Sequence, residues 1–241
     1  MNNAIRIVLV TGALWGALIG AEAAAVPLVV PNAQAAAEGN DANLGPFFDT
    51  SVRYQQVYSA SQFGSTDPLT ISQISFRPDG AATGNLSVVF SVRIDLSTTN
   101  STPTTLSTTF ANNVGADNAT VFNSTIFMTG VPITGPAGGP KDFILTIPIT
   151  PFIYDPDAGD LLLDVRASSL GGISGDLDAQ AGSPFTAHVD ASGIGSTTGA
   201  VIATGLVTRF EVTPVVQVPE PATLALLGLG LAGLGWSRRR K

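Results

Sequence analysis

The sequence contains no cysteine, which excludes disulfide bonds and metal sites built on thiolate. A secreted domain without disulfides must be held together by buried apolar side chains and backbone hydrogen bonds. Histidine is nearly absent as well, since His188 is the only one. A Ser-His-Asp arrangement would have to pass through this residue, and no Gly-x-Ser-x-Gly motif is present to pair with it. We expect His188 to be an exposed strand residue without a catalytic role.

Positive charge is scarce away from the two ends of the chain. The whole sequence has 11 Lys and Arg residues against 18 Asp and Glu residues. Residues 36–217 hold only 6 of the basic residues but 16 of the acidic ones, a net charge of −10. Such a surface repels nucleic acid and anionic lipid, so we expect no nucleic-acid partner.

Residues 36–217 also lack a convincing 3.6-residue apolar periodicity, which argues against amphipathic helices. The clearest pattern is an alternation of apolar and polar residues from Leu86 to Leu96, broken only by Val89. A period of two predicts a strand with one buried face and one face in water. Pro148 interrupts the polar side of a similar run, which predicts an edge strand or a bulge there. Further strands are predicted in or near residues 49–59, 69–76, 104–110, 120–127, 143–149, 161–165, 185–189 and 206–212.

We therefore predict an all-β fold, an antiparallel β-sandwich that is jelly-roll-like and has about nine strands. The chain has 26 Gly and 16 Pro, many of them between the predicted strands, where these residues form turns. Residues 36–46 are expected to be a loose leader. The polar tract 97–109 is expected to be a solvated loop that enters an edge strand. The alternative is a segment that bears sugars or binds a flat polar lattice through its threonine methyl groups. The length of 36–217 suits one domain.

The first residues have the layout of a secretory signal peptide. Residues 1–6 carry one positive charge, residues 7–19 are apolar apart from Thr11, and small residues follow. Cleavage after Ala23 and cleavage after Ala35 both satisfy the small-x-small rule. The second is favoured here, because residues 26–30 would otherwise form an apolar stub, and it gives a signal peptide over 1–35. The expected partners are the secretion translocon and signal peptidase.

Residues 218–241 contain three successive blocks. Pro219, Glu220 and Pro221 form a short extended piece, because proline fixes φ and donates no backbone hydrogen bond. Residues 222–236 carry no charge and must form a helix in lipid. At ~1.5 Å per residue this helix reaches roughly 22 Å, less than the ~30 Å hydrocarbon core, which weakens a permanent span. The last block is the basic cluster Arg238, Arg239, Arg240 and Lys241.

The three blocks in this order resemble the PEP-CTERM sorting signal of Gram-negative surface proteins. The resemblance implies recognition by an exosortase, a membrane enzyme that cuts near the motif, after transient anchoring in the inner membrane. It implies delivery of the body to the cell surface or the exopolysaccharide matrix. An ordinary tail anchor is the alternative. The segment 54–58 also resembles an opening segment of uncharacterised PEP-CTERM proteins, which implies no known activity.

The positive-inside rule agrees with this topology, because it keeps Arg6 and the C-terminal basic cluster in the cytoplasm. The body between them then lies outside. We therefore expect three parts: a signal peptide over 1–35, a β-sandwich domain over 36–217 and a sorting signal over 218–241.

The strongest acidic cluster of the body is the turn that contains Asp155, Asp157 and Asp160. Oxygen ligands around a turn suit calcium, which extracellular modules bind weakly. No glutamate closes the loop as in an EF-hand, and Asp and Pro also build turns without a metal. A second candidate for calcium is residues 175–178. A calcium site and a purely structural turn both remain open at this point.

These observations predict a non-enzymatic surface or matrix protein, exported through its N-terminal signal and sorted by exosortase through its C-terminal motif. The main alternative is a calcium-assisted module that binds exopolysaccharide. A secreted hydrolase that uses two carboxylates is a third possibility, for which the sequence identifies no specific pair.

Overall fold

We analysed a computed structural model of the 241-residue chain. The structure describes residues 24–43, 45–47, 51–173 and 176–215. These residues form one compact unit, Ala24–Val215. The predicted signal helix and the predicted C-terminal membrane helix lie outside the described residues. Within the described ranges, no helix is long and apolar enough to cross a membrane.

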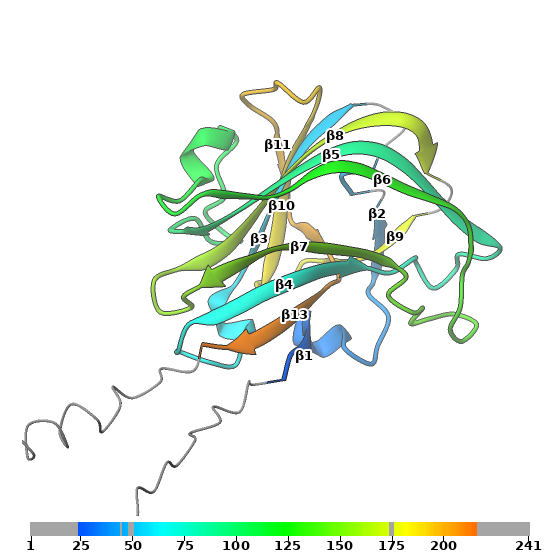
Figure 1. Cartoon of the computed structure of the whole chain (residues 1–241), viewed down its shortest axis with the longest axis horizontal. Helices are drawn as coiled ribbons and strands as arrows, with labels where there is room; N and C mark the ends of the chain where they lie inside the picture. The colour runs from blue at the N-terminus through cyan, green and yellow to red at the C-terminus, as the bar shows by residue number, and fades with distance from the viewer. Residues whose placement is uncertain (1–23, 44, 48–50, 174–175, 216–241) are drawn as a thin grey trace, which may run out of the picture. The chain divides into compact units, whose positions relative to one another are not determined.

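The described residues form thirteen β-strands, and every strand pair is antiparallel. The larger sheets have six and four strands, and a third sheet has three (Figure 1). In order, the six-stranded sheet contains β11 (Ala200–Ile202), β10 (Thr186–Ser192), β3 (Val52–Tyr58), β8 (Asp160–Ile173), β5 (Asn85–Thr99) and β6 (Ala119–Pro132). The four-stranded sheet contains β1 (Val26–Val30), β13 (Thr208–Pro214), β4 (Leu69–Phe76) and β7 (Leu145–Tyr154). The third contains β12 (Thr204–Leu206), β9 (Leu177–Ala181) and β2 (Asp41–Asn43).

The predicted all-β antiparallel fold is confirmed, but the prediction of about nine strands is too low. The additional strands are β1, β2, β9, β11 and β12, which have only three to five residues each. A segment this short has too few alternating positions to stand out in a sequence. The helical content of the described residues is limited to three 3₁₀ turns, η1 (Asn32–Gln34), η2 (Ala60–Gln62) and η3 (Phe110–Asn113).

The main hydrophobic core joins the six-stranded and the four-stranded sheets. Strand β5 confirms the predicted alternation, since its six apolar alternate residues are all buried in this core. They are Leu86, Val88, Phe90, Val92, Ile94 and Leu96. The four-stranded sheet contributes Ile71, Ile74, Phe76, Leu145, Ile147 and Phe210 to the same cluster. A shared core between two sheets fits a β-sandwich, and a jelly-roll topology stays a prediction.

Strand β7 confirms the prediction made from Pro148. This strand lies at the end of the four-stranded order, so it pairs with β4 alone among the described strands. Pro148 pairs with Gln73, next to a register shift between Ile71 and Gln73. A residue without a backbone N–H is tolerated at such an edge.

The predicted loose leader, residues 36–46, is instead held in the fold. Its residues 41–43 form β2, which pairs with β9. The Gly39 N–H donates to Asp178 Oδ1 at 2.9 Å, and the Ala37 carbonyl accepts a bond from Arg77. Just after the leader, the buried Phe47 ring packs edge-on against Phe76 and Phe90. The prediction failed because these contacts join residues far apart in the sequence.

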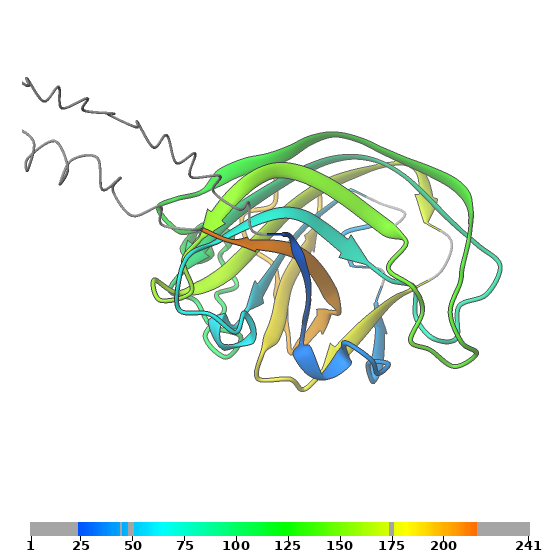
Figure 2. The same cartoon turned by 60° about the horizontal axis from the view of Figure 1, so that its bottom comes forward.

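Residues 26–30, which the sequence analysis placed within the signal peptide, form β1. This strand pairs with β13 over its five residues (Figure 2). Val30 at its end is fully buried in the main core. The compact unit therefore begins upstream of Ala35.

The polar tract 97–109 differs from the prediction of a solvated loop that enters an edge strand. Strand β5 continues to Thr99. Residues 104–109 form a turn and irregular structure with only an isolated bridge between Thr109 and Thr198, and η3 begins at Phe110. The segment packs onto the outer face of the six-stranded sheet. There Leu106 and Phe110 belong to a second hydrophobic cluster, with Val57, Leu162, Ala187 and Val189.

Candidate functional site

The predicted sorting motif, Pro219, Glu220 and Pro221, lies outside the described residues. The same is true of the basic cluster Arg238, Arg239, Arg240 and Lys241. Strand β13 ends at Pro214, and the described chain ends at Val215.

The predicted calcium turn lies between β7 and β8. Asp155 Oδ1 accepts a hydrogen bond from the Asp157 N–H at 3.0 Å, and the Asp155 carbonyl accepts one from Ala158. Asp160 Oδ1 accepts a bond from the Ala60 N–H at 2.8 Å, and burial raises the pKa of this carboxyl. Asp155 and Asp160 therefore each accept a backbone hydrogen bond that stabilises the local structure without a metal. Calcium at this turn stays a prediction, and so does the carbohydrate-binding alternative that depends on it.

A different acidic group brings three carboxylates together. Glu38, Asp79 and Asp178 each offer one oxygen, and these atoms lie within 4.8 Å of one another. Glu38 and Asp79 help to line a surface pocket of ≈ 530 Å³, together with Lys141. In the part of the chain that the structure describes, these three residues make up the one group of three or more Asp, Glu, His or Cys side chains that lie close enough together to hold a metal ion.

Burial, neighbouring charges and hydrogen bonds together shift the pKa of two carboxyls in this acidic group, Glu38 and Asp178. Asp178 Oδ2 pairs with Arg77, and Glu38 Oε1 accepts a bond from the Gly80 N–H. Glu38 Oε2 is buried and has no hydrogen-bond partner. Burial and the neighbouring Asp178 charge raise the pKa of Glu38. Burial also raises the pKa of Asp178, although Arg77 opposes this shift. The pair formed by Glu38 and Asp178 therefore holds a proton more readily than two isolated carboxyl groups would.

The sequence analysis missed most of this group. Asp178 falls in the second calcium candidate, residues 175–178, but Glu38 and Asp79 were not singled out. Glu38 and Asp178 are separated by about 140 residues, and the Gly39–Asp178 hydrogen bond spans 139. Only the pairing of β2 with β9 brings them together.

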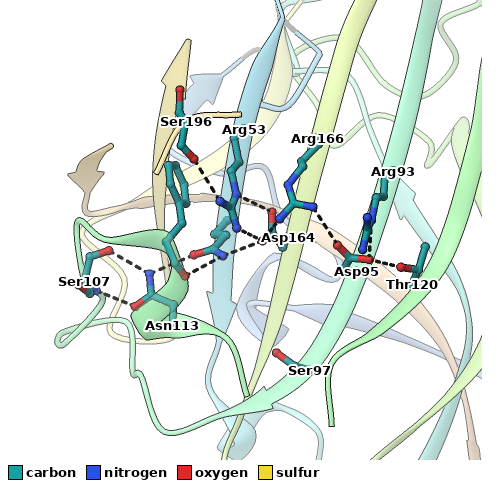
Figure 3. A network of polar contacts seen from close by, with 12 residues as sticks. Arg53, Arg93, Asp95, Ser97, Ser107, Asn113, Thr120, Asp164, Arg166 and Ser196 are labelled. Atoms are coloured by element: carbon teal, nitrogen blue, oxygen red, sulfur yellow. Dashed lines mark hydrogen bonds and ion pairs between the residues drawn. The ribbon is translucent and has the colours of Figure 1, made fainter. Parts of the chain in front are cut away.

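Three arginines and two aspartates form a charged ladder across the outer face of the six-stranded sheet (Figure 3). Arg53 on β3, Arg166 on β8 and Arg93 on β5 lie directly opposite one another in the register. Two residues along, Asp164 and Asp95 form the next row. Like charges opposite each other destabilise a sheet, so the aspartates are needed to offset the arginine row.

The ladder distances show how the two rows are joined. Asp164 Oδ2 lies 2.7 Å from Arg53 Nη2 and 3.7 Å from Arg166 Nη2. Asp95 lies 3.0 Å from Arg93 Nε and 3.6 Å from Arg166 Nη1. Both aspartates are buried, whereas Arg93 is 43% exposed. The ladder therefore links three neighbouring strands, β3, β8 and β5.

One end of the ladder also holds the 100–118 segment on the sheet (Figure 3). Gln55 Nε2 donates to Asp164 Oδ2 and to the Phe110 carbonyl. The Gln55 Oε1 atom accepts a bond from Asn113 Nδ2 at 3.0 Å. The Arg53 guanidinium lies 4.5 Å from the centroid of the Phe110 ring. These contacts replace the strand pairing that the sequence pattern predicted for 104–110.

His188 is buried, with 2% of its surface exposed, so the prediction of an exposed strand histidine is wrong. Its ring stacks on Tyr54 with the centroids 4.9 Å apart. Its Nδ1 atom lies 2.5 Å from the Thr204 carbonyl, so Nδ1 carries the proton and donates it. Burial lowers the pKa of His188. The error arose because Thr204, at the start of β12, covers the face of β10 expected to lie in water.

Comparison with known proteins identifies the C-terminal part of the chain. Residues 217–240 match the family model of the PEP-CTERM protein-sorting motif. No curated protein and no solved structure matches the chain. The match includes Pro219, Glu220 and Pro221, the apolar run and the three arginines of the basic cluster. The chain therefore carries a PEP-CTERM protein-sorting motif over residues 217–240.

Proposed function

We propose that the β-sheet body is a non-enzymatic component of the cell surface or extracellular matrix of a Gram-negative bacterium. The observation that carries this proposal is the sorting motif at residues 217–240, which implies an exported protein processed by an exosortase. In this proposal the motif directs the protein to the exosortase, and the β-sheet body is the part that reaches the cell surface or matrix.

The bonding of the polar groups supports a structural role for the body. His188 is buried between Tyr54 and Thr204, where it does not reach a substrate in solvent. The aspartates of the charged ladder each bind two arginines. Asp178 is neutralised by Arg77. The most buried charges of the body are therefore paired within the fold, where the loss of one partner would be costly.

The fold also supports one of the two signal-peptide cuts. Cleavage after Ala35 would remove β1 and η1, leaving the edge of β13 unpaired and the core without Val30. It would also remove Asn32, whose backbone N–H donates to Gln62 Oε1 at 2.9 Å. Cleavage after Ala23 keeps all of these contacts. We therefore place the mature N-terminus at Ala24.

Localisation of two forms of the protein tests the sorting proposal. The full-length chain and a variant that ends at Gln217 should be expressed in a strain that has an exosortase. We expect the full-length protein at the cell surface or in the exopolysaccharide, and the shortened variant free in the periplasm or medium. Equal retention of both forms in the cell envelope would contradict the proposal.

A matched control separates sorting from folding. A variant with Pro219→Ala and Pro221→Ala keeps the apolar run, the basic cluster and the whole β-sheet body. We expect this variant to stay in the membrane fraction with an unprocessed C-terminus. Normal surface delivery of this variant would show that the tripeptide is not read.

A further inference from the structure

The charged ladder gathers half of the positive charge of residues 36–217 in one row on the outer face of the six-stranded sheet (Figure 3). Arg53, Arg166 and Arg93 are three of the six basic residues in that range, and they stand opposite one another on β3, β8 and β5. Because neighbouring strands are ~4.8 Å apart, the row spans roughly 10 Å. Positive charge is therefore concentrated here on a body whose net charge is −10.

The two aspartates of the ladder do not neutralise this row completely. Asp164 accepts two hydrogen bonds from Arg53, at 2.7 and 3.3 Å, and Asp95 accepts one from Arg93 at 3.0 Å. The Arg166 guanidinium lies 3.6 Å from Asp95 and 3.7 Å from Asp164, and it makes no hydrogen bond to a described residue. Three guanidinium groups against two carboxylates therefore leave one positive charge, which lies at Arg166.

The solvent side of the ladder presents N–H donors rather than carboxylates. The side chains of Asp164 and Asp95 are 2% and 3% exposed, whereas those of Arg166 and Arg93 are 29% and 43% exposed. Within the described part of the chain, Arg93 donates through Nε alone, which leaves its two terminal nitrogens for a ligand. A guanidinium is a planar fork of donors that matches the two oxygens of a carboxylate. Arg166 and Arg93 can therefore hold one ligand carboxylate between them.

A row of hydroxyl groups lies beside the arginines. Thr125, Ser91 and Ser168 are opposite one another on β6, β5 and β8, two residues along each strand from the arginine row. At ~3.4 Å per residue, the two rows are roughly 7 Å apart. Thr125 and Ser91 are exposed. Because a hydroxyl both donates and accepts hydrogen bonds, this row suits a ligand that is itself rich in hydroxyl groups.

The next row along the strands is apolar. Phe127 on β6 lies opposite Val89 on β5, on the same face as Thr125 and Ser91. The Phe127 side chain is 71% exposed. Its ring can cover the C–H face of a sugar ring and remove apolar surface from water. One face of the sheet thus combines a cation, hydroxyl groups and an exposed aromatic ring.

Charge indicates which anionic polymer fits this face. Nucleic acids and anionic membranes carry dense negative charge, which the acidic body repels. At physiological ionic strength the Debye length is about 8 Å, so an isolated carboxylate at Arg166 responds mainly to the groups close to it. A polysaccharide in which uronic acids alternate with neutral sugars offers isolated carboxylates together with many hydroxyl groups. One uncompensated cation matches one carboxylate of such a polymer.

We propose that the outer face of β5, β6 and β8 binds an acidic polysaccharide, with a uronic acid carboxylate held by Arg166 and Arg93. Hydroxyl groups of the same sugar and its neighbours contact Ser91 and Thr125. This inference rests on the proposed surface or matrix role, because only an exported body meets such a polymer. Binding is measured on the purified protein, so its outcome is separate from that of the localisation test.

Hyaluronan oligosaccharides are the probe, because one uronic acid alternates with one neutral sugar along their chain. Their methyl ester keeps every hydroxyl group and removes the negative charge. Calorimetry on the protein exported by an exosortase-containing strain, in EDTA to exclude calcium, measures both dissociation constants. We expect the acid to bind and the ester to bind at least about tenfold more weakly. The absence of acid binding, equal binding of acid and ester, or tighter binding of single-stranded DNA would overturn the proposal.

Replacement of Arg166 tests the assigned cation. Arg166→Gln leaves each ladder aspartate bonded to another arginine, and it should raise the dissociation constant for the acid at least about tenfold. Arg209→Gln is the matched control, because Arg209 is 27% exposed and paired with one carboxylate, Glu211, on β13. This control should bind like the unmodified protein. An unchanged constant for Arg166→Gln, or an equal loss in both variants, would contradict the assignment.

A second variant leaves the whole ladder intact. Ser91→Asp places a negative charge beside the arginine row, where it repels the ligand carboxylate and competes with it for Arg166. We expect this variant to lose at least about tenfold in affinity while it keeps the melting temperature of the unmodified protein. Thr150→Asp adds the same charge at an exposed position of β7 and should leave the affinity unchanged. Unchanged affinity of Ser91→Asp would show that the polysaccharide binds elsewhere.

Discussion

Arg77 and Asp178 form an ion pair that is closed to solvent, with Arg77 Nη2 2.6 Å from Asp178 Oδ2 and the side chains 1% and 0% exposed. The same guanidinium donates to the Ala37 carbonyl and lies 5.1 Å from the centroid of the Phe143 ring. It therefore connects the end of β4 with β9, the N-terminal segment and the loop before β7.

Replacement of Arg77 tests the importance of this connection. Arg77→Leu leaves the buried Asp178 carboxylate without its partner, which typically costs about 3–5 kcal/mol. Arg93→Leu is the matched control, because Arg93 is 43% exposed and its partner Asp95 keeps its contacts with Arg166 and Thr120, so we expect a smaller loss of stability. Urea unfolding of both variants measures the difference. Equal stability of the two variants would show that the buried pair does not hold the fold.

The pKa of Glu38 predicts how stability changes with pH. Burial and Asp178 raise this pKa in the folded chain, so protonation of Glu38 favours folding. This contribution to the free energy of unfolding is fully present below the ordinary pKa of 4.5. It is lost as pH rises through the folded pKa. Glu38→Gln keeps the acceptor for Gly80 but removes the charge. We expect this variant to melt a few degrees higher than the unmodified protein at pH 7 and at the same temperature at pH 4.

The control for Glu38 is Asp142→Asn, which removes one negative charge from an exposed position. It should leave the melting temperature at pH 7 nearly unchanged. A similar gain for both variants would mean that net charge, rather than the Glu38–Asp178 contact, sets the pH dependence.

His188 gives a pH dependence of opposite sign. Burial lowers its pKa below 6.5, so the folded chain binds this proton less readily than the unfolded chain. The contribution of the neutral His188 ring to the free energy of unfolding is present above pH 6.5 and decreases as pH falls through and below that value. As His188 is the only histidine, its ring resonance can be followed by NMR without assignment ambiguity. A measured pKa at or above 6.5 would contradict the buried, neutral ring.

The Asp155 turn should fold without calcium, because its carboxylate already accepts the Asp157 N–H. We expect the melting temperature to be the same in EDTA and in ~5 mM calcium, a concentration that fills weak extracellular sites. Asp155→Ala should cost about 1 kcal/mol, whereas Asp155→Asn keeps an acceptor and should cost less. A calcium-dependent rise in melting temperature that Asp155→Asn abolishes would instead establish a metal site.

The sequence predicted the parts of the fold that depend on local patterns. The Leu86–Leu96 alternation identified the core face of β5, and Pro148 identified an edge strand. Both signals come from neighbouring residues, since side chains alternate between the faces of a strand and proline cannot donate to a ladder.

The sequence did not predict features that depend on distant pairing. His188 sits on a strand whose second face is covered by Thr204, a contact that alternation does not reveal. The acidic group requires β2 to pair with β9, which places Glu38 beside Asp178. Phe47 packs between two sheets although its neighbours suggest a loop. Local patterns identify strands, but not which strands meet.

The intact mass and terminal sequence of the exported protein test the central claim most directly. Our account predicts a chain that begins at Ala24 and has been cut near Pro219, Glu220 and Pro221, so that Trp236 and the terminal arginines are missing. The cut should require the exosortase. An exported chain that keeps Trp236 and Arg238 in a strain with an active exosortase would contradict sorting through this motif.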